Sequence, residues 1–423
     1  MRNSFGGVGG AGMDLPNGWV NAPWSDIVMI THGQNQKSIE DPNGIYPIYG
    51  SGGQIGKSSR YLCKAGSTIV GRKGTINKPF YTHTNFWNID TAFGITPHDG
   101  VLPKFLYLFC THFNFTTLDH STGRPSLTQA NLYKIEMPLP PLAEQCRIVA
   151  KIDALFSELD KGVEMLQTIR QQLRTYRQAV LKWAFEGKFI NIEITGVRKL
   201  EELCFFITKG TTPSKSEMTS NEGEVPFIKV YNLTFGGTLD FSINPTFVNN
   251  ETHSGFLARS KVYPSDVLMN IVGPPLGKVS IVPDKYAEWN INQAIARFRC
   301  NNDLNNKYLT YYLLNQKTIE TVSKKSKATA GQFNLTLEIC RNIEIPYCSL
   351  EEQIRIVDEI ESRLSVCDKL EQIVDESLNK ARALKQSILK KAFAGQLAPQ
   401  DPNDEPAEKL LERIKQAQSV KRK

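Results

Sequence analysis

A long stretch of this chain occurs twice, and the duplication constrains the fold more than any other feature. Residues 123–189 and 331–397 align without a gap at a constant offset of 208, and about 23 of the 67 paired positions are identical. The shared Glu-Gln pair at Glu144-Gln145 and Glu352-Gln353 is one of the clearest matches. Because the period is close to half of the chain, the repeat indicates two copies of one large unit rather than a solenoid of many short ones.

Each copy contains the pattern of a long amphipathic helix. Its apolar residues are separated only by steps of three or four, which is the spacing of a coiled-coil seam. Pro141 precedes the first helix, Ser349 and Glu352 can form a capping box for the second, and Gly187 and Gly395 suit left-handed C-terminal caps. A helix over about residues 143–186 would extend roughly 66 Å. The expected seam residues are Ile148, Ile152, Leu155, Leu159, Val163, Leu166, Ile169, Leu173, Tyr176 and Val180 in the first copy, and Ile356, Ile360, Leu364, Cys367, Leu370, Val374, Leu378, Ala381, Leu384 and Ile388 in the second.

Two such seams in one chain would most simply bury themselves against each other. The segments between the repeats show short strand patterns, turn residues and few helices, which is typical of α/β domains. We therefore predict a mixed α/β fold, with two α/β domains joined by two long antiparallel helices that form a coiled-coil spacer with pseudo-two-fold symmetry. The expected divisions are a flexible tail over 1–15, a first α/β domain over 16–134, a central helical region over 135–195, a second α/β domain over 196–342, a distal helical region over 343–400, and a short helix with a basic tail over 401–423.

Shorter elements can also be assigned from local patterns. The predicted strands cover residues 45–49, 67–70, 227–230 and 267–271, and the predicted helices cover 104–113, 200–206, 308–314 and 406–418.

Composition indicates an ordinary globular chain, with 40% hydrophobic and 22% charged residues. The eight cysteines form no C-x-x-C pair, so we expect reduced thiols that lie mostly in the core. No apolar run approaches the roughly 18 residues that a membrane-spanning helix needs. The N-terminus also lacks the order of a signal peptide. We predict a cytoplasmic protein without a membrane partner.

The net charge of +7 is concentrated in the two α/β domains. Residues 18–134 carry 10 Lys and Arg against 6 Asp and Glu, and residues 196–342 carry 17 against 13. This distribution fits two surfaces that meet a polyanion, although so small an excess also occurs on ordinary solvated surfaces.

Catalytic signatures are absent or incomplete. The segment Gly50–Ser58 resembles a P-loop, but Ser51 replaces the first glycine and no helical pattern follows, which favours an exposed turn. Five of the six histidines lie in the first domain without the spacing of metal ligands. We predict a chain without catalytic residues, metal or cofactor.

The remaining candidates are basic and polar loop residues in both α/β domains. Arg suits guanine, Asn and Gln suit adenine, and Lys, Ser and Thr suit phosphates. For any single residue, a solvated turn is an equally good interpretation. Residues 71–76 match 273–279, and 122–126 match 330–334. The candidate DNA-binding residues are Ser51, Gln54, Lys57, Ser58, Arg60, Arg72, Lys73, Thr122, Arg124 and Ser126 in the first domain, and Lys209, Thr211, Thr212, Ser214, Lys215, Lys229, Asn232, Lys278, Lys324, Lys325, Lys327 and Gln332 in the second.

In the duplicated helix and the loops described above, the sequence resembles the specificity subunit of type I restriction–modification systems. The resemblance covers about residues 16–397, and the second copy departs from it where two prolines are missing in Pro346–Ser349. The segments that carry it are Pro138–Gln145, Leu181–Phe189, Lys209–Ser214, Pro226–Val230 and Asp266–Gly273.

The resemblance implies two target-recognition domains that each read one half of an interrupted double-stranded DNA site. It also implies that the helices set the spacing and dock two methyltransferase subunits, which motor-nuclease subunits then join. Methyl-donor and ATP chemistry would belong to those partners. The residues alone lead only to two basic domains on a helical spacer, so a coiled-coil scaffold that does not read DNA is the alternative, and an autonomous enzyme is a third.

Overall fold

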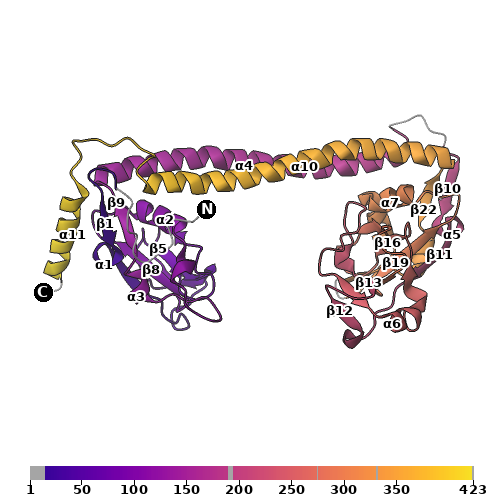
Figure 1. Ribbon diagram of the computed structural model, residues 1–423, viewed down its shortest axis with the longest axis horizontal. Helices are drawn as coiled ribbons and strands as arrows, with labels where there is room; N and C mark the ends of the chain where they lie inside the picture. The colour runs from indigo at the N-terminus through magenta and orange to yellow at the C-terminus, as the bar shows by residue number, and fades with distance from the viewer. Residues whose placement is uncertain (1–14, 189–193, 274, 330–331, 422–423) are drawn as a thin grey trace. The chain divides into compact units, whose positions relative to one another are not determined.

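The computed structural model describes residues 15–188, 194–273, 275–329 and 332–421. The chain divides into two compact units: unit 1 comprises residues 1–166 and 376–423, and unit 2 comprises residues 167–375. Each unit holds one α/β domain and parts of both long helices (Figure 1). The tail predicted over residues 1–15 lies almost wholly outside the described residues.

Unit 1 contains the first α/β domain and the C-terminal helix. Its elements in chain order are β1 (Val20–Pro23), α1 (Trp24–Ile27), β2 (Val28–His32), β3 (Tyr46–Gly50), β4 (Gly53–Ser58), β5 (Thr68–Gly71), β6 (Phe80–Tyr81), β7 (Trp87–Asn88), β8 (Ala92–Pro97), α2 (Pro103–His112), η1 (Phe115–Leu118), α3 (Gln129–Leu132), β9 (Glu136–Leu139), the first part of α4 (Leu142–Phe185), the last part of α10 (Leu350–Phe393), and α11 (Ala407–Lys421).

Unit 2 contains the second α/β domain and the remaining parts of α4 and α10. Its other elements are β10 (Gly196–Lys199), α5 (Leu200–Leu203), β11 (Cys204–Lys209), η2 (Lys215–Glu217), β12 (Met218–Ser220), β13 (Val225–Ile228), η3 (Val230–Asn232), β14 (Thr246–Val248), α6 (Asn250–Ser254), η4 (Ala258–Ser260), β15 (Lys261–Val262), β16 (Val267–Asn270), β17 (Val279–Ile281), β18 (Trp289–Ile291), β19 (Ile295–Cys300), α7 (Asn306–Leu314), α8 (Gln316–Lys324), β20 (Lys327–Thr329), β21 (Gln332–Asn334), α9 (Leu337–Arg341) and β22 (Glu344–Tyr347).

The two units share one sheet plan, as the repeat predicts. An antiparallel sheet has the order β2-β8-β5-β6 in unit 1 and β11-β19-β16-β17 in unit 2. A second sheet in each contains one parallel pair, β3 with β7 and β13 with β18. A two-stranded sheet then leads into each long helix, β1 with β9 and β10 with β22. The predicted mixed α/β class is therefore confirmed.

One short element differs clearly from its prediction. The helix expected over 200–206 ends at Leu203, and Cys204 begins β11, which pairs with β19. Ladder hydrogen bonds and burial in the sheet outweigh the helical pattern of this short segment. The other predicted short elements agree with the structure within a few residues.

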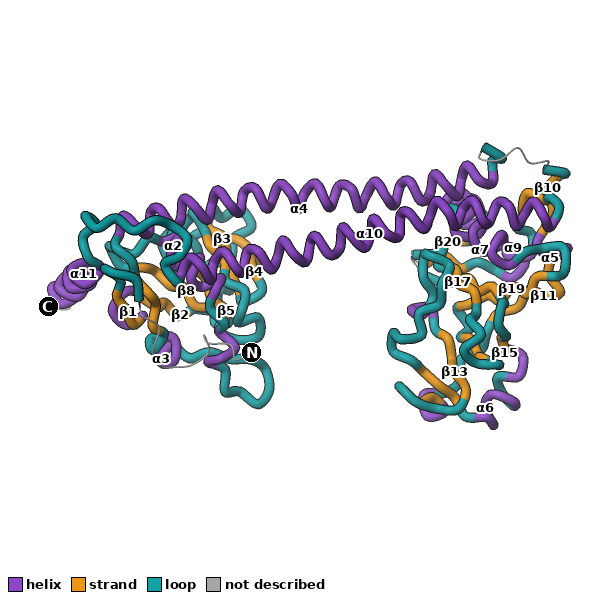
Figure 2. Tube along the Cα trace, turned by 45° about the horizontal axis from the view of Figure 1, so that its top comes forward, coloured by secondary structure: helices purple, strands orange, loops and turns teal. Residues whose placement is uncertain are grey.

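The long helices α4 and α10 pack against each other in both units. In unit 1 the start of α4 meets the end of α10, where Ile148 shares a core with Phe393. In unit 2 the end of α4 meets the start of α10, where Val180 shares a core with Ile356. The helices are therefore antiparallel, as predicted, and each has 44 residues (Figure 2).

The predicted helix boundaries are confirmed. Glu352 Oε2 accepts hydrogen bonds from both the amide and the hydroxyl of Ser349, which completes the capping box. Gly187 and Gly395 have φ angles of 68° and 67°, the left-handed conformation that ends a helix at glycine.

The seam differs from its prediction at three positions. Tyr176, Leu370 and Leu384 are 40%, 42% and 48% exposed. After Leu173 the seam continues at Arg177, one residue later than expected. Steps of three then four residues, or four then three, both lead from Leu173 to the buried Val180, so spacing alone does not choose between Tyr176 and Arg177.

Charged pairs occupy the seam where it shifts. Arg177 binds Asp368 and also Glu371, at 3.1 Å, within unit 2. Lys385 lies 208 residues after Arg177 and binds Asp160 at 2.5 Å within unit 1, so the duplication preserves this ion pair. Exposed pairs contribute only about 0–1 kcal/mol each, so their main effect is to select one register of the two helices.

A buried glutamine fixes the start of α4 to the first domain. Gln145 Oε1 accepts from the Leu102 amide at 2.9 Å, just before α2, and Nε2 donates to the carbonyls of Gly100 and Pro140 at 3.1 Å each. The side chain is wholly buried. One residue therefore joins three chain segments.

Gln353 repeats this arrangement in unit 2. Its Oε1 accepts from the Asn305 amide at 2.8 Å, and Nε2 donates to the carbonyls of Asp303 and Cys348 at 2.9 and 3.1 Å. The glutamine of the Glu-Gln pair therefore makes the same hydrogen bonds at both helix starts. The glutamates differ, since Glu144 accepts from Trp19 Nε1 and Glu352 caps the helix through Ser349.

The C-terminal helix α11 packs on unit 1, where Leu410 and Ile414 are buried. Gly100 has a φ angle of 106°, and a Cβ there would lie 2.7 Å from Leu410 Cδ1, so a side chain at this position would be strained and would crowd α11. In unit 2 the equivalent residue is Asp303, since its carbonyl accepts from Gln353 as that of Gly100 does from Gln145. The Asp303 side chain would block a helix placed on unit 2 as α11 is placed on unit 1.

Candidate nucleic-acid interface

In unit 1 the loop after β5 is fastened to the loop before α3. Leu127 N donates to the Arg72 carbonyl at 2.8 Å, Gly74 N donates to the Pro125 carbonyl at 2.8 Å, and Lys73 pairs with Ser126 as an isolated bridge. Candidates that are distant in sequence, Arg72 and Lys73 with Arg124 and Ser126, are thus brought together on one surface. We call residues 72–74 and 122–126 the loop face of unit 1.

Arg124 is held at this face by the shape of its neighbours. Gly74 has a φ angle of 84°, which favours glycine, and a Cβ there would lie 2.7 Å from Arg124 Nη2, so the guanidinium packs directly against this glycine. Asp119 accepts from the Ser121 hydroxyl and amide, at 2.7 and 3.0 Å, and from the Ser126 amide at 3.1 Å. These hydrogen bonds lower the pKa of Asp119, and the bond from the Ser121 hydroxyl has the largest effect. The loop is therefore ordered while Arg124 and Thr122 remain exposed.

The Gly-rich segment 50–58 forms the β3–β4 hairpin. Gly50 pairs with Gly53 across a two-residue turn, and a strand follows where a P-loop requires a helix. The segment is therefore a hairpin and not a phosphate-binding loop, but the predicted exposed turn is limited to residues 51–52, where Ser51 is buried. Gln54 and Lys57 are exposed on β4, and Arg60 is exposed after it.

Three candidates are corrected by their burial. Ser51 is 8% exposed, and Ser58 and Asn232 are fully buried. Ser58 Oγ lies 2.6 Å from the Arg60 carbonyl, and Asn232 Nδ2 donates to two backbone carbonyls at 2.8 and 3.1 Å. The Ser58 and Asn232 side chains therefore satisfy internal backbone groups, and burial keeps all three side chains off the exposed surface.

Unit 2 has the same fastening between equivalent loops. Leu335 N donates to the Ile271 carbonyl at 2.9 Å, and Val272 pairs with Asn334 as an isolated bridge. Leu335 and Asn334 lie 208 residues after the two residues that make these contacts in unit 1. The backbone framework is conserved between the units while the side chains on it change.

This equivalence corrects one predicted loop match. Arg72 and Lys73 correspond to Ile271 and Val272, and not to positions in 273–279. The shared glycines at 71 and 273 suggested the wrong alignment, because glycine occurs in both loops for different local reasons. The match of 122–126 with 330–334 agrees with the bridge at Asn334, although residues 330–331 lie outside the described residues.

A glycine at the end of β11 brings Lys209, Thr211 and Thr212 against β18. A Cβ at Gly210 would lie 2.0 Å from the Ile291 carbonyl oxygen, and Thr211 N donates to the same carbonyl at 3.2 Å. The Thr212 hydroxyl accepts from the Gln293 amide at 3.3 Å. Lys209 and Thr212 are exposed, and Thr211 is half-buried.

The same contact in unit 1 reveals residues that the sequence reasoning missed. A Cβ at Gly33 would lie 1.8 Å from the Ile89 carbonyl oxygen, and Gln34 N donates to the Asn88 carbonyl at 2.9 Å. Gly33 is thus equivalent to Gly210, although the surrounding sequences share little else. The equivalents of Lys209, Thr211, Thr212 and Ser214 are His32, Gln34, Asn35 and Lys37, all four of which are exposed.

Other candidates in unit 2 are partly occupied by internal contacts. Lys278 Nζ lies 3.5 Å from the Val230 carbonyl and 5.9 Å from the Phe235 ring, so it covers the segment that follows the half-buried Lys229. The Ser214 hydroxyl donates to Glu217 at 2.6 Å, and this hydrogen bond is the main reason why the pKa of Glu217 is lowered.

The last candidates are not joined into one cluster by the described contacts. Lys215 and Lys324 are exposed, and Lys324 ends α8. Lys325 lines a cavity together with the end of α4. The side chains of Lys327 and Gln332 lie outside the described part of the chain.

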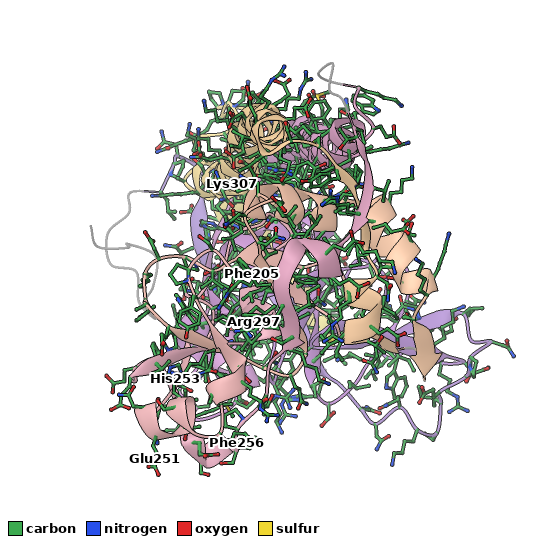
Figure 3. All side chains as sticks on the ribbon, turned by 90° about the vertical axis from the view of Figure 1, so that its right-hand side faces the viewer. Phe205, Glu251, His253, Phe256, Arg297 and Lys307 are labelled. Carbon is green, nitrogen blue, oxygen red and sulfur yellow. The ribbon has the colours of Figure 1, made fainter. Side chains whose placement is uncertain are left out.

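A polar network adjoins Lys209 in unit 2, and Figure 3 labels two of its members, Arg297 and His253. Arg297 is 7% exposed and donates to the Thr208 hydroxyl at 2.9 Å and to the Lys261 carbonyl. Glu288 contacts His253 at 2.6 Å and Lys261 at 3.0 Å, and the His253 hydrogen bond is the main reason why the pKa of Glu288 is lowered to about 2. The network ties β11 and β19 to β15.

A family model for the type I restriction modification DNA specificity domain matches residues 16–171 and 193–380. The two matches lie on the two copies of the duplicated fold. The chain belongs to the type I restriction–modification DNA specificity family.

Individual members of the specificity family agree with this assignment. The EcoBI specificity subunit of Escherichia coli is 27% identical over 74% of this chain and 70% of its own. The EcoKI specificity subunit of Escherichia coli K12 is 25% identical over 95% of this chain and 96% of its own. A solved chain from a study of complex assembly and conformational transition in the type I system covers 91% of this chain and 100% of its own, with 21% identity and a TM-score of 0.68, and shows the same fold.

Within the described residues, no group of three or more His, Cys, Asp and Glu side chains could hold a metal ion. No helix in the same part of the chain is both long and apolar enough to cross a membrane. Six of the eight cysteines are buried, as expected, whereas Cys146 is exposed and Cys300 is half-buried.

Proposed function

We propose that this type I DNA specificity subunit binds double-stranded DNA through both α/β domains, and that each domain reads one half of a bipartite site. The observation that carries the proposal is the conserved loop framework with different side chains. Lys73 and Ser126 in unit 1 are replaced by Val272 and Asn334 on the same backbone pairing. Such a scaffold suits two readers that recognise different base sequences.

We propose that the domains predicted over 16–134 and 196–342 are these readers, and that α4 and α10 set the distance between the half-sites and dock two methyltransferase subunits. Restriction subunits would join the same complex. Exposed apolar side chains on α10, such as Val366 and Ile373 at 55% and 56%, support a protein-binding role for the helices.

The chain itself would be non-catalytic and bind no cofactor, so that methyl transfer and ATP hydrolysis belong to the partners. It would act in the cytoplasm, where the DNA is. A coiled-coil scaffold without DNA reading is the competing function. If the affinity of the assembled complex for DNA falls steeply with rising salt, DNA reading is favoured, because each phosphate contact releases counterions.

Arg124→Ala is expected to weaken methylation at one half-site only. The guanidinium is exposed on an ordered loop, and a good arginine contact to a base contributes about 1–3 kcal/mol, which corresponds to a roughly 5- to 160-fold effect. The measurement is the methylation rate of the assembled complex on duplexes that carry one intact and one altered half-site. Lys64→Ala is the matched control, since Lys64 is exposed in the same unit but outside the loop face. An equal loss at both half-sites, or none, would remove Arg124 from the interface.

A further inference from the structure

Unit 2 contains a cavity of about 230 Å³ between the end of α4, α8 and β22. One of its lining residues, Lys325, is also a DNA-binding candidate, but neither the DNA-reading nor the helix-docking role needs a cavity. Its walls come from three segments that are far apart in sequence: residues 182–186, 312–325 and 339–346. A ligand there would touch both the long helix and the α/β domain.

The lining combines exposed amines with buried apolar groups. Lys182, Lys317 and Lys325 are exposed, whereas Phe185 and Val322 are buried. The charged groups therefore lie toward solvent and the apolar groups lie inside. An amphiphilic ligand with an anionic end matches this order.

Two carboxylates also line the cavity, and one of them is already compensated. Glu186 binds Lys188 at 2.8 Å and Lys317 at 3.4 Å, and the Lys188 hydrogen bond is the first cause of its lowered pKa. The other carboxylate, Glu344, is exposed. With Lys188 counted, four lysines face two carboxylates, so the surroundings of the cavity are positive.

Unit 1 shows what fills the same space in the other copy of the fold. Phe393 is the equivalent of Phe185, and the His112 ring stacks on it at a centroid distance of 5.5 Å and an interplanar angle of 14°. Phe113 and Phe115 extend this aromatic cluster, with centroids 5.1 Å apart.

In unit 2 the ring that covers the phenylalanine is missing. The equivalent of His112 is Asn315, as the shared hydrogen bonds at the starts of α2 and α7 show, and Gln316 and Thr318 follow it. Phe185 retains only its contacts with Tyr308 and Tyr312 among the aromatic contacts of the described residues, at 5.1 and 5.0 Å. The space that rings occupy in unit 1 is therefore open in unit 2.

We propose that this cavity binds a small organic anion with a flat apolar group, of the aryl or nucleoside phosphate class. The flat group would lie near Phe185, and the anionic group would lie among Lys182, Lys317 and Lys325. A single water needs about 10–15 Å³ of such volume, so a bare inorganic ion would leave most of the cavity unfilled. This proposal does not rest on the proposed DNA reading, although Lys325 is a candidate for both roles.

Calorimetric titration of the full chain with phenyl phosphate, and separately with inorganic phosphate, tests the proposal. We expect phenyl phosphate to bind at least about tenfold more tightly than inorganic phosphate, because only the former fills the apolar part. The double variant Lys182→Gln, Lys325→Gln should weaken binding at least about tenfold by removing two cations. Thr321→Phe should abolish binding by filling the cavity with a ring.

Lys390→Gln is the matched control, since Lys390 is the equivalent of Lys182 in the unit whose space is already filled. This variant should bind phenyl phosphate as the parent chain does, and thermal unfolding verifies that each variant is folded. Titration with adenosine monophosphate separates a nucleotide site from a general aryl phosphate site. Equal binding of phenyl phosphate and inorganic phosphate, no binding at millimolar phenyl phosphate, full retention of binding in Thr321→Phe, or equal weakening by Lys390→Gln would each overturn the proposal.

Discussion

Gln353→Leu is expected to destabilise unit 2 by about 3–5 kcal/mol, because it leaves one amide and two carbonyls without their partner in the interior. The Asn305 amide and the carbonyls of Asp303 and Cys348 all bond to this one side chain. The free energy of unfolding is measured by urea denaturation of the full chain, with hydrogen exchange at the start of α7 to locate the loss.

Two variants make the comparison specific. Gln145→Leu should produce a loss of similar size in unit 1, since Gln145 makes the equivalent three hydrogen bonds. Gln386→Leu, at an exposed position of α10, should change stability by less than about 0.5 kcal/mol. A loss below about 1 kcal/mol in Gln353→Leu would mean that water replaces the missing bonds and that the glutamine does not fix the helix start.

Inserting one heptad in both α4 and α10 is expected to abolish most methylation of the native site and to create a site with a longer spacer. Insertions after residues 168 and 376 leave the ion pairs of Arg177 and of Lys385 on either side intact. Seven helical residues add roughly 10.5 Å, which corresponds to about three base pairs of B-DNA. Sequencing of methylated DNA from cells that express the complex measures the spacer directly.

An insertion in α4 alone is the control for this experiment. It shifts part of one helix against the other by two turns, so the Arg177–Asp368 and Lys385–Asp160 pairs can no longer both form, and it should abolish methylation at every spacer length. If the double insertion left the spacer unchanged, the helices would not determine the distance between half-sites.

The sequence predicted the architecture because the duplication and the seam are global signals. Steps of three and four residues over 44 positions specify a long helix regardless of detail. They did not specify which residue of Tyr176 and Arg177 enters the seam, since both positions satisfy the spacing. The choice depends on Asp368 and Glu371 of the opposite helix, which local pattern does not contain.

The candidate interface was predictable only in part. Residue type directed attention to Arg72 and Arg124, but it also selected Ser58 and Asn232, whose polar groups satisfy the backbone inside the fold. Conversely, Gln34 and its neighbours carry no distinctive motif. Their equivalence to the loop after β11 follows from the close approach of Gly33 to the Ile89 carbonyl, a contact between residues far apart in the chain.

The central claim is that each unit reads one half of the DNA site independently of the other. Exchanging residues 16–134 for those of another specificity subunit, followed by single-molecule sequencing of methylated bases in the host genome, tests it most directly. The account predicts that one half of the methylated sequence changes to that of the donor while the other half and the spacer stay the same. A change in both halves, or in neither, would contradict it.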